Sequence, residues 1–240
     1  MRKILVIMML LLGANFVLAN DIKFTDKVTQ EDFNNFVKEL GTALLFNPNA
    51  PAEPLGIIGF DVSLETVITD ISEDEAYWKK LIVDNAPNSY LAVPRLHVQK
   101  GLPFNIDVGA MYVVVPDTNI KLWGLEAKYA ILEGTTITPA ISIRASYSKL
   151  QGVDDVDLNT QSLDVLISKG VFMLTPYAGA SIFKTNGSEN SNLVTLRDVS
   201  ENNYRLLAGI QFSPLPLLSI NGEISLGEVP QYGLKIGFRF

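Results

Sequence analysis

Apolar and polar residues alternate along most of this chain, from near residue 55 to its last residue. In the C-terminal stretch QYGLKIGFRF, every second side chain is bulky and apolar: Tyr232, Leu234, Ile236, Phe238 and Phe240. Successive side chains of a β-strand point to opposite faces, so this stretch predicts a strand with one apolar face. Taken alone, the pattern is typical both of a half-buried strand in a soluble sheet and of a strand that crosses a membrane.

The same period-two pattern predicts ten β-strands in the chain. Their expected bounds are 55–69, 88–99, 103–115, 120–132, 136–149, 158–169, 171–184, 202–212, 217–227 and 231–240. Most of these segments reach the roughly 9–11 residues that a tilted strand needs to cross a bilayer. An even number of antiparallel strands brings both ends of a barrel to the same side of a membrane.

The connections between the predicted strands alternate between long polar segments and short turns. The long connections are 70–87, 150–157 and 185–201. The short ones are 100–102, 133–135, the turn around Gly170, and 213–216. Barrels that cross a membrane show the same asymmetry, with the long loops on the outer side.

Aromatic residues of the apolar face fall near the ends of the predicted strands. One group is expected at the outer rim: Tyr90, Tyr112, Trp123, Tyr147, Tyr204 and Tyr232. A second group is expected at the inner rim: Phe104, Phe172, Phe212, Phe238 and Phe240. Membrane barrels carry two such aromatic girdles at the level of the lipid headgroups.

The polar face of the predicted strands carries charges of both signs in equal number. The acidic residues are Asp61, Glu65, Asp107, Glu126, Asp164 and Glu223, and the basic residues are Arg95, Lys128, Arg144, Arg205, Lys235 and Arg239. We expect no charge on the opposite face, because a charge facing lipid costs roughly 2–4 kcal/mol at the bilayer midplane. Together with His97, the charged residues are predicted to line a narrow interior, in which opposite charges pair.

The first residues have the pattern of a secretory signal. Arg2 and Lys3 supply a basic start, a short apolar run follows, and small residues precede the position after Ala19. This pattern predicts a signal peptide over residues 1–19 that is cleaved after Ala19. The alternative is a helix buried in the fold.

Residues 20–54 form a second N-terminal unit, ahead of the predicted barrel over residues 55–240. Thr29 is a suitable helix N-cap, and apolar residues recur at helical spacing after it, which predicts an amphipathic helix over 29–46. A proline-rich linker then continues to Pro54. Two interpretations stay open: the helix plugs the barrel, or it packs against a sheet.

Composition limits the possible functions. Cleavage after residue 19 removes Arg2 and Lys3, so 17 of the 19 basic residues remain against 26 acidic ones, a net charge of −9. Such an acidic chain is a poor nucleic-acid binder. The absence of cysteine and the single histidine exclude disulfides and the common thiolate and histidine metal sites. No metal or cofactor is predicted. Because no later apolar run reaches membrane-helix length, membrane insertion requires a closed barrel.

The last ten residues resemble the C-terminal assembly signal of Gram-negative outer-membrane β-barrels. That pattern places a polar residue, a glycine and two apolar residues before a terminal aromatic, and here it is matched by Gln231, Gly233, Ile236, Phe238 and Phe240. The resemblance implies an all-β, antiparallel, up-and-down barrel in the outer membrane of a Gram-negative bacterium. It also implies two partners, the outer-membrane lipids and the barrel-assembly machinery, which reads the C-terminal strand.

Three functions are compatible with these patterns. The favoured one is a narrow, porin-like channel for ions or small solutes, closed or left open by the N-terminal helix. The second is a non-conducting barrel that binds partners through its outer loops or serves envelope structure. One loop carries an apolar cluster that either contacts a partner or, as is commoner, folds the loop onto the rim: Tyr77, Trp78, Leu81 and Ile82. The third is a soluble periplasmic β-protein that carries an apolar ligand.

His97 is the only candidate for a catalytic base, and an enzyme is not predicted. Its strand places it near the inner end of the barrel with its side chain toward the lumen. Barrel proteases need a histidine at the outer rim, and barrel lipid hydrolases need one that faces lipid. We therefore expect His97 to be a hydrogen-bonded residue of the lumen.

Overall fold

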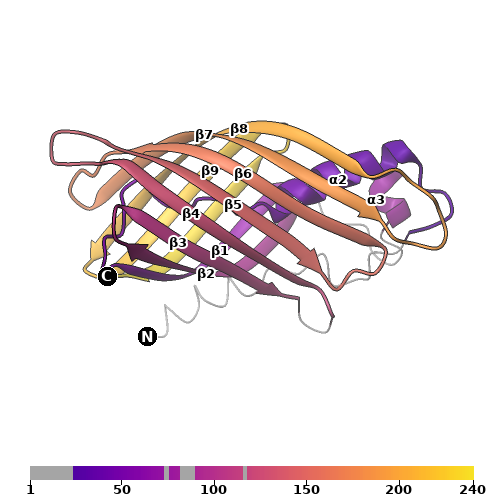
Figure 1. The fold of residues 1–240 in the computed structure, drawn as a ribbon, viewed down its shortest axis with the longest axis horizontal. Coiled ribbons are helices and arrows are strands. Elements are labelled where there is room, and N and C mark those ends of the chain that lie inside the picture. The colour runs from indigo at the N-terminus through magenta and orange to yellow at the C-terminus, as the bar shows by residue number, and fades with distance from the viewer. Residues whose placement is uncertain (1–23, 73–75, 82–89, 116–117) are drawn as a thin grey trace.

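The computed structural model describes residues 24–72, 76–81, 90–115 and 118–240 (Figure 1). The expected signal peptide over residues 1–19 lies outside the described residues. Ten antiparallel strands close into one barrel, in which each strand pairs with its neighbours in sequence and the first strand pairs with the last. The prediction of an all-β, up-and-down barrel of ten strands is confirmed.

The strands have the following bounds: β1 Phe60–Asp70, β2 Tyr90–Leu102, β3 Ile106–Val114, β4 Lys121–Glu133, β5 Ala140–Gln151, β6 Val156–Ser168, β7 Leu174–Glu189, β8 Val199–Leu215, β9 Leu218–Gly227 and β10 Gln231–Arg239. In the described ranges, helix α2 Gln30–Leu44 precedes β1, and helix α3 Ala76–Leu81 lies between β1 and β2. Among the described residues, neither the length nor the apolar character of any helix suffices to cross a membrane.

Several strand ends differ from the expected bounds. β1 starts at Phe60 instead of residue 55, because the preceding residues turn, with the Gly59 N–H donating to the Gly56 carbonyl (2.9 Å). Residues 100–102, expected as a turn, belong to β2.

The expected loop over residues 185–201 is strand at both of its ends, in residues 185–189 and 199–201. β7 and β8 stay paired as far as Gly187 and Val199, so only residues 190–198 connect them. Here the outward side chains are polar, and the apolar alternation that predicts strands is lost although the backbone ladder continues.

The first and last strands close the barrel along a nine-residue register, from Asp61 opposite Arg239 to Thr69 opposite Gln231. Phe60 and Phe240 extend this pairing with two backbone hydrogen bonds of 2.6 and 2.9 Å. Their rings stack with centroids 5.8 Å apart. No strand of the sheet is therefore left with an unpaired edge.

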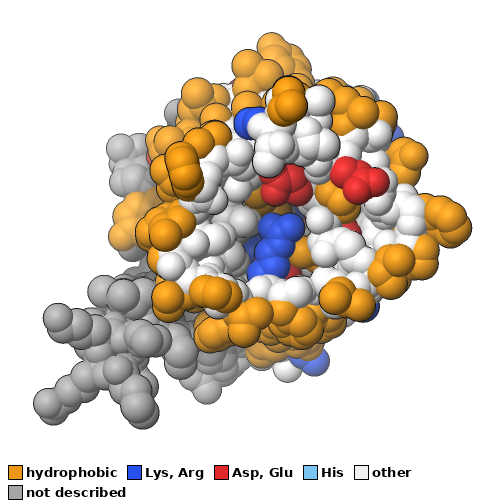
Figure 2. All heavy atoms as spheres, turned by 90° about the vertical axis from the view of Figure 1, so that its left-hand side faces the viewer, with side chains coloured by type: hydrophobic (Ala, Val, Ile, Leu, Met, Phe, Trp, Pro, Cys, Tyr) orange, Lys and Arg blue, Asp and Glu red, His pale blue; other side chains and the backbone are white. Residues whose placement is uncertain are grey.

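The barrel is apolar outside and ionic inside. Leu125, Ile182 and Phe238 on the outer surface are 54%, 63% and 66% exposed, whereas Arg144 and Glu223 in the interior are 1% and 3% exposed. Figure 2 looks into one end, where apolar side chains surround the rim and charged side chains lie in the hollow within it. This distribution is the reverse of that in a soluble barrel and suits a surface in contact with acyl chains.

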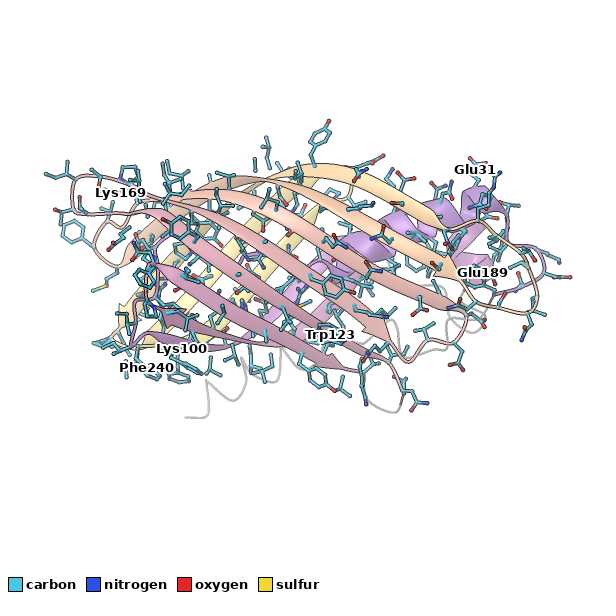
Figure 3. All side chains as sticks on the ribbon, in the orientation of Figure 1. Glu31, Lys100, Trp123, Lys169, Glu189 and Phe240 are labelled. Carbon is cyan, nitrogen blue, oxygen red and sulfur yellow. The ribbon has the colours of Figure 1, made fainter. Side chains whose placement is uncertain are left out.

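The two ends of the barrel differ. Lys100, Lys169 and Phe240 lie at one end in Figure 3, and Glu31 and Glu189 lie at the other. We refer to them as the C-terminal end and the helix end.

The expectation that the outer face carries no charge is wrong near the strand ends. Four lysines point outward from the barrel wall: Lys100, Lys121, Lys149 and Lys184. For the last three, the sequence neighbours on the inner face are buried: Leu122, Leu150 and Phe183. The cost of a charge falls to about 0–1 kcal/mol where strands pass the hydrocarbon core, so such positions tolerate lysine.

Helix α2 lies inside the helix end of the barrel. It begins with a capping box, in which Thr29 and Asp32 each bond the other's backbone N–H. Its buried side chains, among them Phe33, Phe36 and Leu40, pack on inward-facing apolar residues of the strands. The helix contacts β1, β2 and β5 to β8, so it meets the wall on several sides (Figure 1).

Helix α3 packs beside α2 at the rim. Trp78 is buried, meets the Phe36 ring at 5.3 Å and donates its indole N–H to Glu39 (2.6 Å). Tyr77 is buried as well. This part of the predicted apolar cluster therefore folds against the helix. Ile82 lies outside the described residues.

Two glycines allow α2 to lie close to β7. A Cβ atom at Gly41 would collide with Thr185, and one at Gly187 would collide with Val37. We predict that Gly41→Leu displaces the helix, because overpacking costs about 1–3 kcal/mol. Trypsin should then cleave the folded protein after Lys38 roughly tenfold faster, which a digest of the intact barrel measures.

The matched control is Gly222→Leu, because a Cβ atom at that position meets no other atom within 4 Å. It should leave the cleavage rate unchanged. Equal cleavage of the two variants would contradict the close helix contact, provided both still migrate as folded barrels before boiling.

Candidate functional site: the ionic lumen and the segment that crosses it

Residues 45–55 cross the lumen from the end of α2 toward the C-terminal end of the barrel. Pro48, Pro51 and Pro54 recur at every third position, so the segment can form neither a helix nor a strand ladder. Residues 45–52 are nevertheless buried. Buried backbone groups need hydrogen-bond partners, and here the side chains of the wall supply them.

Three cations of the wall bind carbonyl groups of this segment. Arg95 donates to the Leu45 carbonyl (2.8 Å), and Arg144 donates to the Phe46 carbonyl (2.7 Å). Further along, Lys128 donates to the Glu53 carbonyl (2.9 Å) and to the Pro51 carbonyl (3.3 Å). Hydrogen bonds from charged donors are stronger than neutral ones, so these contacts fix the path of the segment.

Acceptors of the wall bind the N–H groups of the same segment. The Asn49 N–H donates to Glu223 (2.9 Å), and the Leu55 N–H donates to Asp107 (3.0 Å). Between them, the Ala52 N–H donates to the Ser168 hydroxyl (3.1 Å). The mixed charges of the lumen are thus complementary to the backbone that crosses it, cations to carbonyls and carboxylates to N–H groups.

Arg144 is at the centre of the ionic network. Its guanidinium donates to Glu126 and, at 2.5 Å, to Asp164. The same group lies 4.9 Å above the Phe46 ring. One side chain therefore joins three wall strands to the crossing segment by two ion pairs, a backbone contact and a cation–π contact.

His97 bridges two carboxylates of the wall. Its Nε2 lies 2.9 Å from Glu126, its Nδ1 lies 3.3 Å from Glu65, and its ring meets Phe46 edge-on at 4.7 Å. The residue is 0% exposed. In this arrangement the ring has no access to solvent, and its contacts are those of a hydrogen-bonded lumen residue.

A second ionic layer lies nearer the C-terminal end. Lys128 pairs with Asp107 (3.0 Å), and the Lys235 ammonium lies 3.5 Å from Asp61. Arg239 is only half-buried and donates to Gln211 (3.2 Å). Basic and acidic side chains are visible within this end in Figure 2.

The thirteen predicted lining residues all point into the lumen, and twelve of them are buried, with Arg239 the exception. Eleven of them pair with one another or with the crossing segment instead of bordering an open bore at mid-height, and Arg205 and Arg239 donate to Gln231 and Gln211. Within the described residues, no group of three carboxylate or imidazole side chains is placed to hold a metal ion.

The predicted assembly-signal residues divide between the two faces of β10. Ile236, Phe238 and Phe240 lie on the outer face. Gln231 faces the lumen and donates to the Thr42 carbonyl of α2 (2.8 Å). Gly233 also faces the lumen, where a Cβ atom would collide with the Asn49 side chain. The last strand therefore forms part of the inner surface on which the N-terminal segment packs.

Sequence reasoning placed residue 46 at the end of the helix and treated residues 47–54 as a linker, and it missed their contacts with the wall. Phe46 and Asn49 are the main omissions, together with the backbone carbonyls around them. The available signal was the regular spacing of three prolines, which leaves backbone groups without a ladder partner. A charged lumen supplies such partners.

The closed sheet, its apolar exterior and its ionic interior define the chain as a β-barrel of the outer-membrane type. No protein-family model matches the chain, and no curated protein matches it.

Several solved structures share the general barrel architecture at low scores. The Ail attachment invasion locus protein of Yersinia pestis, solved with the heparin analogue sucrose octasulfate, is 14% identical with a TM-score of 0.32, covering 76% of this chain and 98% of its own. The N-terminal barrel domain of Pseudomonas aeruginosa OprF is 14% identical with a TM-score of 0.35, covering 77% and 99%. The KdgM porin is 8% identical with a TM-score of 0.37, covering 75% and 99%.

Loss of Arg144 should destabilise the barrel more than loss of a cation at the rim. Arg144→Met leaves Glu126 and Asp164 buried without their partner, which costs about 3–5 kcal/mol. Arg239→Met removes a half-buried contact and should cost about 1 kcal/mol or less. Urea unfolding of both variants in lipid or detergent measures the difference. Equal losses would show that the central network contributes no more than the rim.

Proposed function

We propose that the protein is an outer-membrane barrel that forms a narrow channel, held closed by residues 24–55 as an internal plug. The observation that carries this proposal is the pairing of wall charges with plug backbone groups along the lumen. Arg95, Arg144 and Lys128 bind its carbonyls, and Glu223 and Asp107 bind its N–H groups. These polar contacts hold the plug in place, and water can replace each of them if the plug leaves.

Displacement of the plug would leave a bore lined by both signs of charge. The interior of a ten-stranded barrel is intermediate in width between the filled lumen of eight-stranded barrels and the aqueous channel of sixteen-stranded porins. Such a bore passes ions or small solutes, and its rings of charge set the selectivity. The apolar part of the plug, α2, occupies the helix end, so release from that end exposes the ionic layers below it.

Export and assembly follow from the two ends of the chain. The signal peptide directs export from the cytoplasm and is removed after Ala19. The outward-facing Ile236, Phe238 and Phe240 of the last strand contact the barrel-assembly machinery during insertion. Mature barrels then contact outer-membrane lipids through the apolar belt. The longer connections, residues 71–89 and 190–198, favour the helix end as the extracellular one.

The non-conducting barrel is the main alternative, and it too is supported by a specific observation. Phe33, Phe36 and Leu40 are fully buried, so release of α2 would expose a large apolar surface. Burial of each such side chain contributes about 1.5–3 kcal/mol. A plug that never leaves would make this protein a closed scaffold for its outer loops.

The soluble carrier is disfavoured by the side-chain distribution. It requires apolar residues around an internal ligand and charges toward water, whereas Phe238 is outside and Arg144 inside. Extraction of the protein from cells distinguishes the two hypotheses. A membrane barrel should need detergent, whereas a soluble carrier should be released by osmotic shock.

A disulfide between plug and wall tests the channel directly. The chain has no cysteine, and a Cβ atom at Gly187 would lie 3.3 Å from the Val37 Cβ, close to disulfide geometry. In planar bilayers we expect Gly41→Leu to open more often than the unaltered chain. Adding Val37→Cys and Gly187→Cys should abolish these openings when oxidised and restore them when reduced.

Each single cysteine variant is the control, and neither should respond to reductant. No conductance from any form would end the channel proposal and leave the closed scaffold. Equal conductance of the double-cysteine variant in its oxidised and reduced forms would show that the plug does not control opening.

A further inference from the structure

Three outward lysines form a row near the helix end of the barrel wall, which we name the lysine row: Lys121 on β4, Lys149 on β5 and Lys184 on β7. Lys121 pairs with Gln151, two residues from Lys149, so the two lysines are diagonal neighbours about 7–8 Å apart at Cα. Lys149 pairs with Asn159 on β6, and Gln161 two residues later pairs with Lys184. The row therefore crosses four adjacent strands.

The lysine row has no ionic partner in the described part of the chain. The outward lysines at the C-terminal end differ, because their ammonium groups are occupied. Lys100 donates to the Ile57 carbonyl (2.6 Å), and Lys169 donates to the Thr135 carbonyl (2.6 Å). An acidic chain that keeps three free cations on one outer face offers a local site for an anion.

Asp157 is the outward acid on β6 above the row, two residues from Asn159, which pairs with Lys149. Its carboxylate accepts a hydrogen bond from Asn190 (3.0 Å). Amides flank the lysines on the outer face and can donate to an anion without adding charge: Asn159 and Gln161 between Lys149 and Lys184, and Asn202 beyond Lys184. The row therefore has hydrogen-bond donors on both sides of Lys184.

Two grooves run along the apolar wall below the row. One, of about 550 Å³, lies between β6, β7 and β8, with Leu163, Ile182 and Tyr204 below and Lys184 above. The other, of about 470 Å³, lies between β4, β5 and β6. It is deepened by two small side chains, Ala127 and Ala145, between larger neighbours. Both grooves reach Gln161, which pairs with Lys184, so they meet at the row.

We propose that this face binds a phosphorylated membrane lipid of the leaflet at the helix end, with its phosphate on the lysine row and acyl chains in the two grooves. Lysine binds phosphate as a point charge, and basic residues near a membrane surface attract anionic lipid. Trp123 and Tyr147, in contact at 5.6 Å beside the row, mark the headgroup level. The proposal rests on membrane insertion, but on neither the plug nor the channel.

Native mass spectrometry of the full chain in detergent tests the proposal. The probe is phosphatidic acid, compared with diacylglycerol of the same acyl chains and with inorganic phosphate. The combined variant Lys121→Gln, Lys149→Gln and Lys184→Gln should bind phosphatidic acid at least tenfold more weakly. The control, Lys100→Gln with Lys169→Gln, should bind it within twofold of the unaltered chain.

A second variant separates the grooves from the charges. Ala127→Leu with Ala145→Leu fills one groove and keeps every lysine, and it should weaken phosphatidic acid binding at least threefold. Equal binding by the lysine variant, or an equal loss in its control, would overturn the site. So would inorganic phosphate binding as tightly as the lipid, because the acyl grooves would then be irrelevant.

Membrane insertion is checked separately on the same samples. All variants should migrate faster before boiling than after, as folded barrels do, and should need detergent for extraction. A chain that fails these checks contradicts the proposed function, whereas a folded, inserted chain without lipid preference contradicts only the lysine row.

Discussion

Backbone polar groups that are shielded from water must find hydrogen-bond partners, and this constraint governs both parts of the molecule. In the wall it is met by closing the sheet, since β1 pairs with β10 and no edge remains. In the lumen it is met by side chains, because the proline-rich segment has no ladder of its own. The ionic interior and the crossing segment are therefore one system, in which Arg144 has the largest share of contacts.

The lumen has two chemically different halves, and each matches the part of the chain that fills it. At the helix end, inward residues such as Val93, Met111 and Leu158 are apolar and pack on α2. At mid-height the inward residues are charged and contact an extended backbone. The backbone groups inside a helix are already hydrogen-bonded to one another, so they cannot pair with charges of the wall. An extended backbone exposes N–H and carbonyl groups, which would lack partners against an apolar wall. The order of side chains along each strand thus specifies how deep the helix lies.

Much of the fold follows from period-two alternation, because every strand must present one face to lipid and the other to the lumen. That rule locates the ten strands and the inward side of Arg144 and Glu223. It fails where strands leave the hydrocarbon core, since β7 and β8 continue with polar residues on both faces. It also cannot show what fills the lumen. Charge balance along the strands indicates pairing, but the pairing of Arg95 with the Leu45 carbonyl depends on a segment without periodicity.

In the proposed channel, the plug contacts hold the lumen closed and still permit opening, because water can replace them. While the plug is seated, Arg95, Arg144 and Glu223 are shielded, and an unpaired charge among them would cost several kcal/mol. Once it leaves, water enters and solvates the same groups, and opposite charges such as Lys128 and Asp107 remain paired across adjacent strands. When the plug leaves, hydrogen bonds between plug and wall are therefore replaced by hydrogen bonds to water. The remaining cost is exposure of the apolar surface of α2, so in the proposed channel the helix, more than the ionic network, sets how often the lumen opens.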